Sequence, residues 1–283
     1  MRLAFYTYSY TDRLKMSIPD CLERIAKTGY SGIDVSATNG PSDDPRSFDD
    51  DRRRLTRQTA EKHCLRIEAM VTHAELTNTL FDPKLKPLDL QRTVDLATAV
   101  GGTAVTVHTG GYPEGVERRT VWDKTVNVIK EAADYGAARH VRLMVDGIWP
   151  DWIDSSPDEL ERLFDDVDSP NFGVNLDPGV LTMMGVDPVE FIRRFDRHIF
   201  HAHLKDHITN EPKDDGPKWT QTMLGRGEVD YVRVFQALGR IKFNESAAAE
   251  CFTFMEFEEA CDSSFTAMVD AARKAGVPFT KAS

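Results

Sequence analysis

Four short apolar runs in the second half of the chain each end in a side chain that can bind a cation. Each run has the length and the apolar content of a buried strand. Because charged groups are costly to bury without a partner, their polar ends indicate a site rather than a core. The alternative is that each acid caps a helix or pairs with an arginine. The runs lie in the stretches 141–147, 172–179, 199–206 and 246–252, and their polar residues include Asp146, Asp177, His203 and Glu250.

The run His201-Ala-His-Leu-Lys-Asp206 is the richest of these in polar groups. The pleat of a strand places alternate residues on one face, so His201, His203 and Lys205 share a side at different depths. An imidazole pair, an ammonium and a carboxylate at one strand end favour a functional site. The competing interpretation is a solvated strand end whose histidines are satisfied by hydrogen bonds.

Strand-like and helix-like segments alternate along the whole chain. This pattern gives about eight strand–helix pairs, which is typical of a (β/α)8 TIM barrel and predicts an α/β fold with a single domain over 1–283. Two long polar segments, 39–51 and 208–228, read as loops, and the second contains Lys213, Asp214 and Asp215. The earlier strands are predicted at 2–8, 32–36, 66–73 and 104–110, and the helices at 17–28, about 51–63, 85–100, 118–135, 156–167, 187–195, 229–241 and 256–275.

The acidic balance of the chain limits its partners. A formal net charge of -11 opposes a nucleic-acid-binding surface, which is normally basic. The four cysteines are dispersed without CxxC spacing, and we interpret them as free thiols in a reducing compartment. No segment predicts a secretory leader or a membrane span, so a cytoplasmic location and no membrane partner are expected.

In a parallel barrel the carboxyl ends of the strands converge on one face, where active sites form. Asp146, Asp177, His203 and Glu250 are therefore expected to meet. Three carboxylates and one imidazole suit a divalent metal ion such as Mn²⁺, Mg²⁺, Co²⁺ or Zn²⁺. Two further predicted strands end near the histidines His73 and His108. We expect both to lie on the same face of the barrel and to contact the substrate.

With these motifs the chain resembles the xylose-isomerase-like TIM-barrel sugar isomerase/epimerase family, whose relatives include ketose 3-epimerases, 2-keto-myo-inositol dehydratase and endonuclease IV. The resemblance covers nearly the whole chain and rests on VTH, VHTGG, NLDPG, HAHLKD, LGRGEVD and AAAEC. It implies a metal set of Asp146, Asp177, His203 and Glu250. It also implies that Asp146 and Glu250 exchange protons with the substrate.

The chain departs from the family pattern at three positions. Asp146 stands where the family has glutamate, which shortens the first ligand by one methylene. Val180 stands where a histidine usually follows the second ligand, and Trp152 stands where the ketose epimerases have a substrate-binding glutamate. These changes weaken a ketose 3-epimerase assignment more than they weaken the barrel or the metal centre.

The resemblance implies an enzyme of carbohydrate metabolism. We expect a divalent-metal-dependent isomerase or epimerase that moves a proton on a ketose or keto-sugar through an enediolate. A sugar dehydratase or lyase and a non-catalytic sugar-binding barrel remain the alternatives, with a DNA-repair endonuclease ranked last. The partner is a small-molecule sugar, and a homo-oligomer is allowed. The expected substrate contacts are His73, His108, Trp152, Lys205 and Arg226.

Overall fold

Eight parallel strands close into a barrel, as predicted from the alternation of segments. The computed structural model describes residues 1–37, 48–210, 218–251 and 256–280. Each strand pairs with its neighbour in chain order, and β10 closes the barrel between β7 and β1. The barrel strands are β1 (Arg2–Tyr6), β2 (Gly32–Ser36), β3 (Arg66–Glu75), β4 (Ala104–His108), β5 (Arg142–Val145), β6 (Phe172–Leu176), β7 (Ile199–Leu204) and β10 (Ser246–Ala249).

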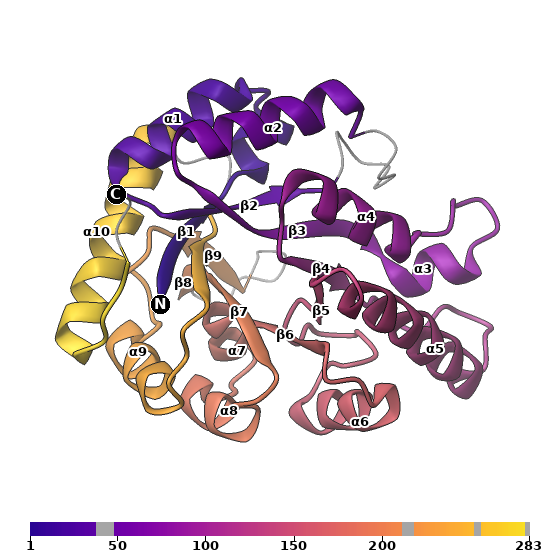
Figure 1. Cartoon of the computed structure of the whole chain (residues 1–283). Coiled ribbons are helices and arrows are strands. Elements are labelled where there is room, and N and C mark those ends of the chain that lie inside the picture. The colour runs from indigo at the N-terminus through magenta and orange to yellow at the C-terminus, as the bar shows by residue number, and fades with distance from the viewer. Residues whose placement is uncertain (38–47, 211–217, 252–255, 281–283) are drawn as a thin grey trace.

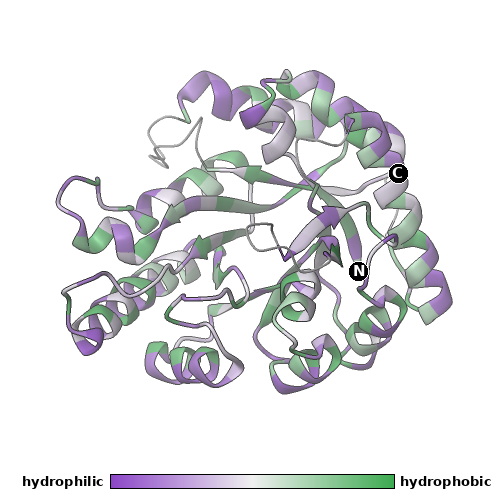
Figure 2. Cartoon of the chain, turned by 180° about the vertical axis from the view of Figure 1, so that it is seen from behind, coloured by the Kyte–Doolittle hydropathy of each residue, from purple (hydrophilic) through white to green (hydrophobic). Residues whose placement is uncertain are grey.

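Helices surround this barrel, and α10 lies between α9 and α1 so that the ring closes where the chain began (Figure 1). Their ribbons carry hydrophobic and hydrophilic residues side by side, as expected when one face covers the barrel (Figure 2). The helices are η1 (Ser9–Arg13, a short π-helix), α1 (Ile18–Thr28), α2 (Asp50–Lys62), α3 (Leu76–Phe81), α4 (Leu90–Val100), α5 (Arg118–Ala137), α6 (Pro157–Val167), α7 (Pro178–Met183), α8 (Pro188–Arg194), α9 (Tyr231–Arg240) and α10 (Phe257–Ala275).

Side chains at several helix starts explain where these helices begin. Ser17 accepts a hydrogen bond from the Asp20 amide at the start of α1, and Ser156 caps α6 in the same way. The helix predicted at 85–100 was wrong at its start, because Pro87 disfavours a helical residue before it and Asp89 caps α4. The short helices α3 and α7 were not predicted.

The segment predicted as a loop at 208–228 contains more order than expected. Strands β8 (Asp206–Thr209) and β9 (Trp219–Thr222) pair as an antiparallel hairpin outside the barrel. Lys213, Asp214 and Asp215 lie outside the described residues, as does most of the loop predicted at 39–51. Among the described residues, no helix has the combination of length and apolar content that crossing a bilayer requires.

Gly173 in β6 illustrates how closely the barrel wall packs. A Cβ at this position would overlap the His198 carbonyl oxygen and lie 2.7 Å from ring carbons of Phe200. Gly102 after α4 has room, because the nearest atoms to a Cβ there are 3.4 Å away.

We therefore expect Gly173→Ala to lower the free energy of unfolding by about 1–3 kcal/mol, because backbone or ring must shift. The matched Gly102→Ala variant should change it little. Urea unfolding monitored by circular dichroism measures both. An unchanged midpoint for Gly173→Ala would contradict this account of the packing.

Candidate active site

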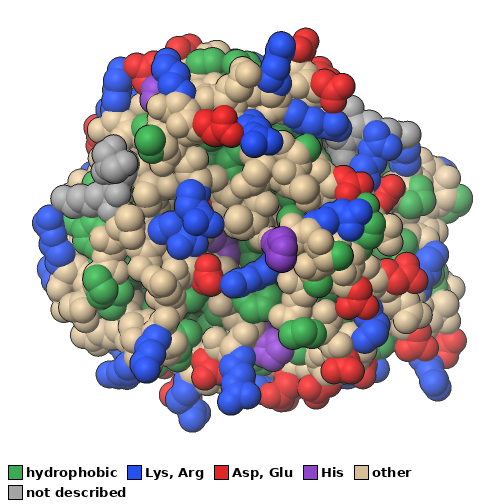
Figure 3. Space-filling view, in the orientation of Figure 1, with side chains coloured by type: hydrophobic (Ala, Val, Ile, Leu, Met, Phe, Trp, Pro, Cys, Tyr) green, Lys and Arg blue, Asp and Glu red, His purple; other side chains and the backbone are tan. Residues whose placement is uncertain are grey.

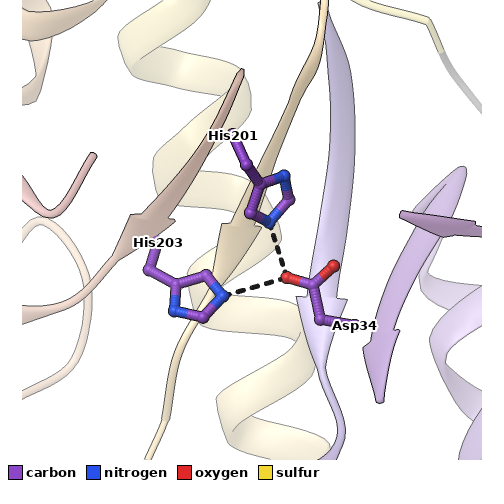
Figure 4. Close-up of side chains that lie close together, drawn as sticks. All are labelled: Asp34, His201 and His203. Atoms are coloured by element: carbon purple, nitrogen blue, oxygen red, sulfur yellow. Dashed lines mark hydrogen bonds and ion pairs between the residues drawn. The ribbon is translucent and has the colours of Figure 1, made fainter. Parts of the chain in front are cut away.

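Strand β7 and the residue that follows it direct three polar side chains inward, at successive depths. The deepest, His201, meets the Ser246 hydroxyl through Nδ1 at 2.7 Å and Asp34 Oδ2 through Nε2 at 2.7 Å. His203 meets the same Asp34 oxygen through Nε2 at 3.1 Å (Figure 4). Lys205 follows two residues later. The alternation predicted for His201, His203 and Lys205 is therefore confirmed, and all three are buried.

Asp34 of β2 links the two histidines, and the sequence interpretation did not include it. Burial alone would raise the pKa of Asp34, but His201 and His203 outweigh it and lower the pKa to about 2. Burial would lower the pKa of His203, but Asp34 and Glu250 raise it to about 10. Asp34 is therefore an ionised acceptor that sets the orientation of the His203 ring.

The atoms of Asp34, His201 and His203 lie within 4.8 Å of one another, close enough to share a metal ion. Their contacts of 2.7 and 3.1 Å have the lengths of N–H···O hydrogen bonds. Ligands of one tetrahedral ion at roughly 2.0–2.1 Å stand more than about 3 Å apart. The deeper group therefore fits hydrogen bonds better than a metal in this conformation.

The four predicted metal ligands meet above this group, around His203 and Lys205. His203 Nδ1 lies 3.1 Å from Glu250 Oε2 and 3.7 Å from Asp146 Oδ1. Lys205 Nζ lies 2.9 Å from Asp177 Oδ2 and 3.0 Å from Glu250 Oε2. Asp146, Asp177 and Glu250 directly follow β5, β6 and β10, so the strand ends deliver them to one place.

Lys205 is the principal cation among these carboxylates. Its side chain is 7% exposed, and its Nζ also lies 5.0 Å from the centre of the Trp149 ring. Burial would lower the pKa of Lys205, but Asp177, Glu250 and Asp146 together raise it. The ammonium therefore stays charged, and the Tyr231 hydroxyl fixes its strand by donating to the Lys205 carbonyl at 2.6 Å.

The three carboxylates have different surroundings. Burial opposes ionisation of Asp146, but His108 and then His203 and Lys205 hold its pKa well below the usual range. Lys205 and His203 likewise outweigh burial and lower the pKa of Glu250. Burial dominates at Asp177 and raises its pKa, because Lys205 offsets only part of that cost and Glu250 and Asp146 add repulsion.

Both oxygens of Asp146 already have partners. Asn175 Nδ2 donates to Oδ1 at 2.7 Å, and His108 Nε2 lies 3.2 Å from Oδ2. Glu250 is different, because both of its described ion pairs use Oε2 and its side chain is 17% exposed. Asp146 is 6% exposed and Asp177 is fully buried. Glu250 is therefore the carboxylate that a substrate reaches most easily.

Aromatic and imidazole rings form one wall beside these carboxylates. His73 Nε2 lies at hydrogen-bond distance, 2.8 Å, from the Tyr6 hydroxyl, and its ring stacks on Tyr8 with ring centres 3.9 Å apart. Burial and the nearby His108 lower the pKa of His73 to about 3, so it is neutral. The wall brings together the predicted His73, His108 and Trp152 with Tyr6, Tyr8 and Trp149, which were not predicted as contacts.

Arg226 lies apart from the other predicted substrate contacts. Its side chain is 62% exposed, and it pairs with Glu259 of α10 at 3.7 Å. It also lines a groove of about 560 Å³ between α9 and α10. Its loop is held by Asp206, whose carboxylate accepts the amides of Gly225 and Gly227 at 2.9 and 3.0 Å. A substrate contact by Arg226 stays a prediction.

Two residues that the sequence analysis missed, Tyr6 and Asp34, could have been found from the pattern of their strands. Tyr6 and Asp34 are polar side chains in the apolar strands β1 and β2. A polar residue in a run that is otherwise buried predicts an inward-facing partner. The interpretation followed only the polar strand ends from 66–73 onward, so it overlooked these two.

The donor set fits a divalent ion. Asp177 Oδ2 and Glu250 Oε2 are buried oxygens without a well-formed hydrogen bond among the described residues, and both face Lys205. Three carboxylates and one imidazole nitrogen are ligands that Mg²⁺, Mn²⁺, Co²⁺ and Zn²⁺ accept. The same oxygens that would hold an ion are the ones now paired with the ammonium.

The barrel agrees with the comparison to known proteins. Residues 22–274 match the family described as the xylose isomerase-like TIM barrel, and the chain belongs to this family. An inosose dehydratase from Geobacillus thermodenitrificans is 24% identical over 127 residues. That match covers 41% of this chain and 42% of the dehydratase, so it spans less than half of either protein.

Solved structures share the fold at low identity. The D-allulose 3-epimerase from Methylomonas sp. superposes with a TM-score of 0.75 at 17% identity, covering 96% of this chain and 98% of that one. A xylose isomerase-like TIM barrel protein from Mycobacterium smegmatis, in complex with magnesium, gives a TM-score of 0.75 at 16% identity, with 97% of each chain covered. Epimerases and dehydratases thus occur among the proteins that this chain resembles.

Asp154 holds in place the loop that follows β5 and carries Trp149 and Trp152. It is fully buried, and its Oδ1 accepts the Thr109 hydroxyl at 2.6 Å. The adjacent Ile153 amide donates to the Gly110 carbonyl at 2.9 Å, so this loop is tied to the end of β4. Burial raises the pKa of Asp154 to about 7, with Glu159 and Asp146 adding repulsion while Thr109 opposes the shift.

Because this folded-state pKa lies above the unfolded value of about 3.9, Asp154 favours the folded state at acidic pH. That contribution is lost as pH rises from about 4 through 7. Between pH 4 and 8 the wild type should lose about 2–4 kcal/mol more unfolding free energy than Asp154→Asn. Urea unfolding across pH checks this, with the exposed Asp165→Asn as the matched control. Parallel profiles for wild type and Asp154→Asn would contradict it.

Proposed function

We propose that the protein is a divalent-metal-dependent isomerase or epimerase that acts on a ketose or keto-sugar. The observation that supports this best is the convergence of Asp146, Asp177, His203 and Glu250 at one end of the barrel. Glu250 is the most exposed of the four and is placed to exchange a proton with a bound substrate. Members of the same fold with 3-epimerase activity are consistent with this proposal.

The four proposed ligands would hold the ion through three carboxylate groups and the imidazole of His203. The chemistry that such an ion supplies when bound is Lewis-acid polarisation of a carbonyl and a neighbouring hydroxyl oxygen. Asp34 contributes from below, because it accepts from His203 Nε2 and leaves Nδ1 directed toward Glu250 and Asp146.

Glu250 acts as the base in this proposal. In this conformation Lys205 and His203 lower its pKa by pairing with Oε2, and a cation at that same oxygen leaves Oε1 to accept a proton from the substrate carbon. Asp146 is the second acid/base group, and His108 holds its carboxylate in place. Proton removal and return by two groups on different sides of one carbon would invert that carbon.

The aromatic wall suits a sugar. Flat rings of Tyr8 and Trp152 offer surface to the C–H face of a polyol, while His73 and His108 offer hydrogen bonds to its hydroxyls. Acidic and basic side chains are interspersed over the face shown in Figure 3, without the continuous basic surface that a nucleic acid needs. A small polyhydroxylated substrate is the better match.

A sugar dehydratase is the second candidate, and the surroundings of Asp146 favour it. With both oxygens already occupied, Asp146 is a weak base, so only Glu250 is well placed to take a proton. A site with one strong base suits elimination of a neighbouring hydroxyl, with Lys205 as the group that donates a proton to the leaving oxygen. The partial likeness to an inosose dehydratase is consistent with this.

The base assignment predicts that Glu250→Gln nearly abolishes solvent deuterium uptake into ketoses and keto-sugars. An amide cannot accept the proton, so the loss should be about 10²–10⁴-fold. Mass spectrometry of the recovered sugars measures it, with Mn²⁺ in excess and metal content determined separately. Glu190→Gln, an exposed change on α8, is the control. Full exchange by metal-loaded Glu250→Gln would contradict the assignment.

Asp146→Glu separates the two candidate reactions. If Asp146 is a compromised second base of an epimerase, the longer side chain should leave epimerisation at least as fast as in the wild type. If the short acid is needed for elimination, turnover of a keto-sugar to its dehydrated product should fall. Product analysis by NMR distinguishes the two. No turnover or exchange in either protein, across metals and sugars, would leave a non-catalytic sugar-binding barrel.

A further inference from the structure

The position of Lys205 bears directly on how an ion enters the proposed metal centre. Its Nζ lies 2.9 Å from Asp177 Oδ2 and 3.0 Å from Glu250 Oε2, so it pairs with two of the four proposed ligands. It stands two residues after the third ligand, His203, directly beyond the end of β7. The ammonium is thus built into the ligand cluster and does not reach it from a distant surface loop.

Charge balance explains why an ammonium lies there. Asp146, Asp177 and Glu250 bring three carboxylates into a space that is almost closed to solvent. Like charges repel strongly where water is excluded, so a cation is needed to hold them together. Lys205 supplies it within the chain. An ammonium and a divalent ion at the same oxygens would in turn repel each other.

We propose that Lys205 is an internal counter-ion that competes with a divalent cation for Asp177 and Glu250. This inference rests on the proposed metal centre. When an ion binds, the ammonium leaves these two oxygens and moves toward the ring of Trp149, whose centre is already 5.0 Å from Nζ. The face of an indole ring is a favourable site for an ammonium.

This arrangement has two consequences. The carboxylates stay together without an ion, because the lysine offsets their repulsion. Metal affinity is lower than the same four ligands would give alone, because every ion that enters must displace the ammonium. A monovalent cation gains little from replacing another single positive charge, so the exchange favours divalent ions.

The test is Mn²⁺ binding to chelator-treated protein, measured by electron paramagnetic resonance of the free ion. Lys205→Met keeps an unbranched side chain that is one atom shorter and removes its charge. We expect Lys205→Met to bind Mn²⁺ at least about tenfold more tightly than the wild type. The control Lys84→Met removes an exposed lysine before α4 and should bind like the wild type.

The outcomes separate this inference from the metal centre itself. Equal or weaker binding by Lys205→Met, with wild-type binding intact, would overturn the competition and leave the metal centre standing. Binding by neither protein would overturn both. Tight binding by Lys205→Met alone would support the competition and show that lysine excludes the ion from the native site.

Thermal unfolding covers the case in which Lys205→Met is unstable without metal. Its melting temperature should be lower than that of the wild type without Mn²⁺ and should rise more when Mn²⁺ is added.

A second measurement uses the native lysine and the emission of Trp149. Saturating Mg²⁺ should change tryptophan emission in the wild type, and Trp149→Phe should lose that change. Binding of Mg²⁺ without any effect of Trp149→Phe on the signal would overturn the proposed movement.

Discussion

The compensation of buried negative charge is the interaction on which the site depends. Three strand ends bring Asp146, Asp177 and Glu250 together, and each would be costly to bury alone. Lys205 and the protonated ring of His203 offset that cost in the present conformation. Apolar side chains of similar volume often stabilise an interior as well as buried ion pairs do, so the stability of the barrel does not explain this cluster.

The pleat of β7 connects this cluster to the interior of the barrel. His201 and His203 in β7 and Lys205 just after it occupy successive inward positions, and their contacts reach Asp34, Asp177 and Glu250 on other strands or strand ends. Asp34 of β2 receives both histidines on one oxygen, so the orientation of His203 is set from across the barrel. Replacing Asp34 would therefore disturb His203 without touching any other proposed metal ligand.

The sequence interpretation was most accurate where local pattern and strand geometry agree. The barrel, its strands and the meeting of Asp146, Asp177, His203 and Glu250 follow from parallel strands whose carboxyl ends share one face. It was wrong for the start of the helix at 85–100 and for the parts of the loop at 208–228 that form β8 and β9. Pro87 and the cap at Asp89 set the start of α4 at Leu90. Pairing between β8 and β9 orders part of the segment 208–228.

The sequence by itself determined the fold and the kinds of group at the strand ends, because side-chain periodicity and residue chemistry are local properties. Only the tertiary structure decided which groups pair. It placed Lys205 between two carboxylates, gave Asp146 the partners Asn175 and His108, and set Arg226 on the outer groove. These contacts join residues far apart in the chain, so they depend on strand register and barrel closure, which no local pattern contains.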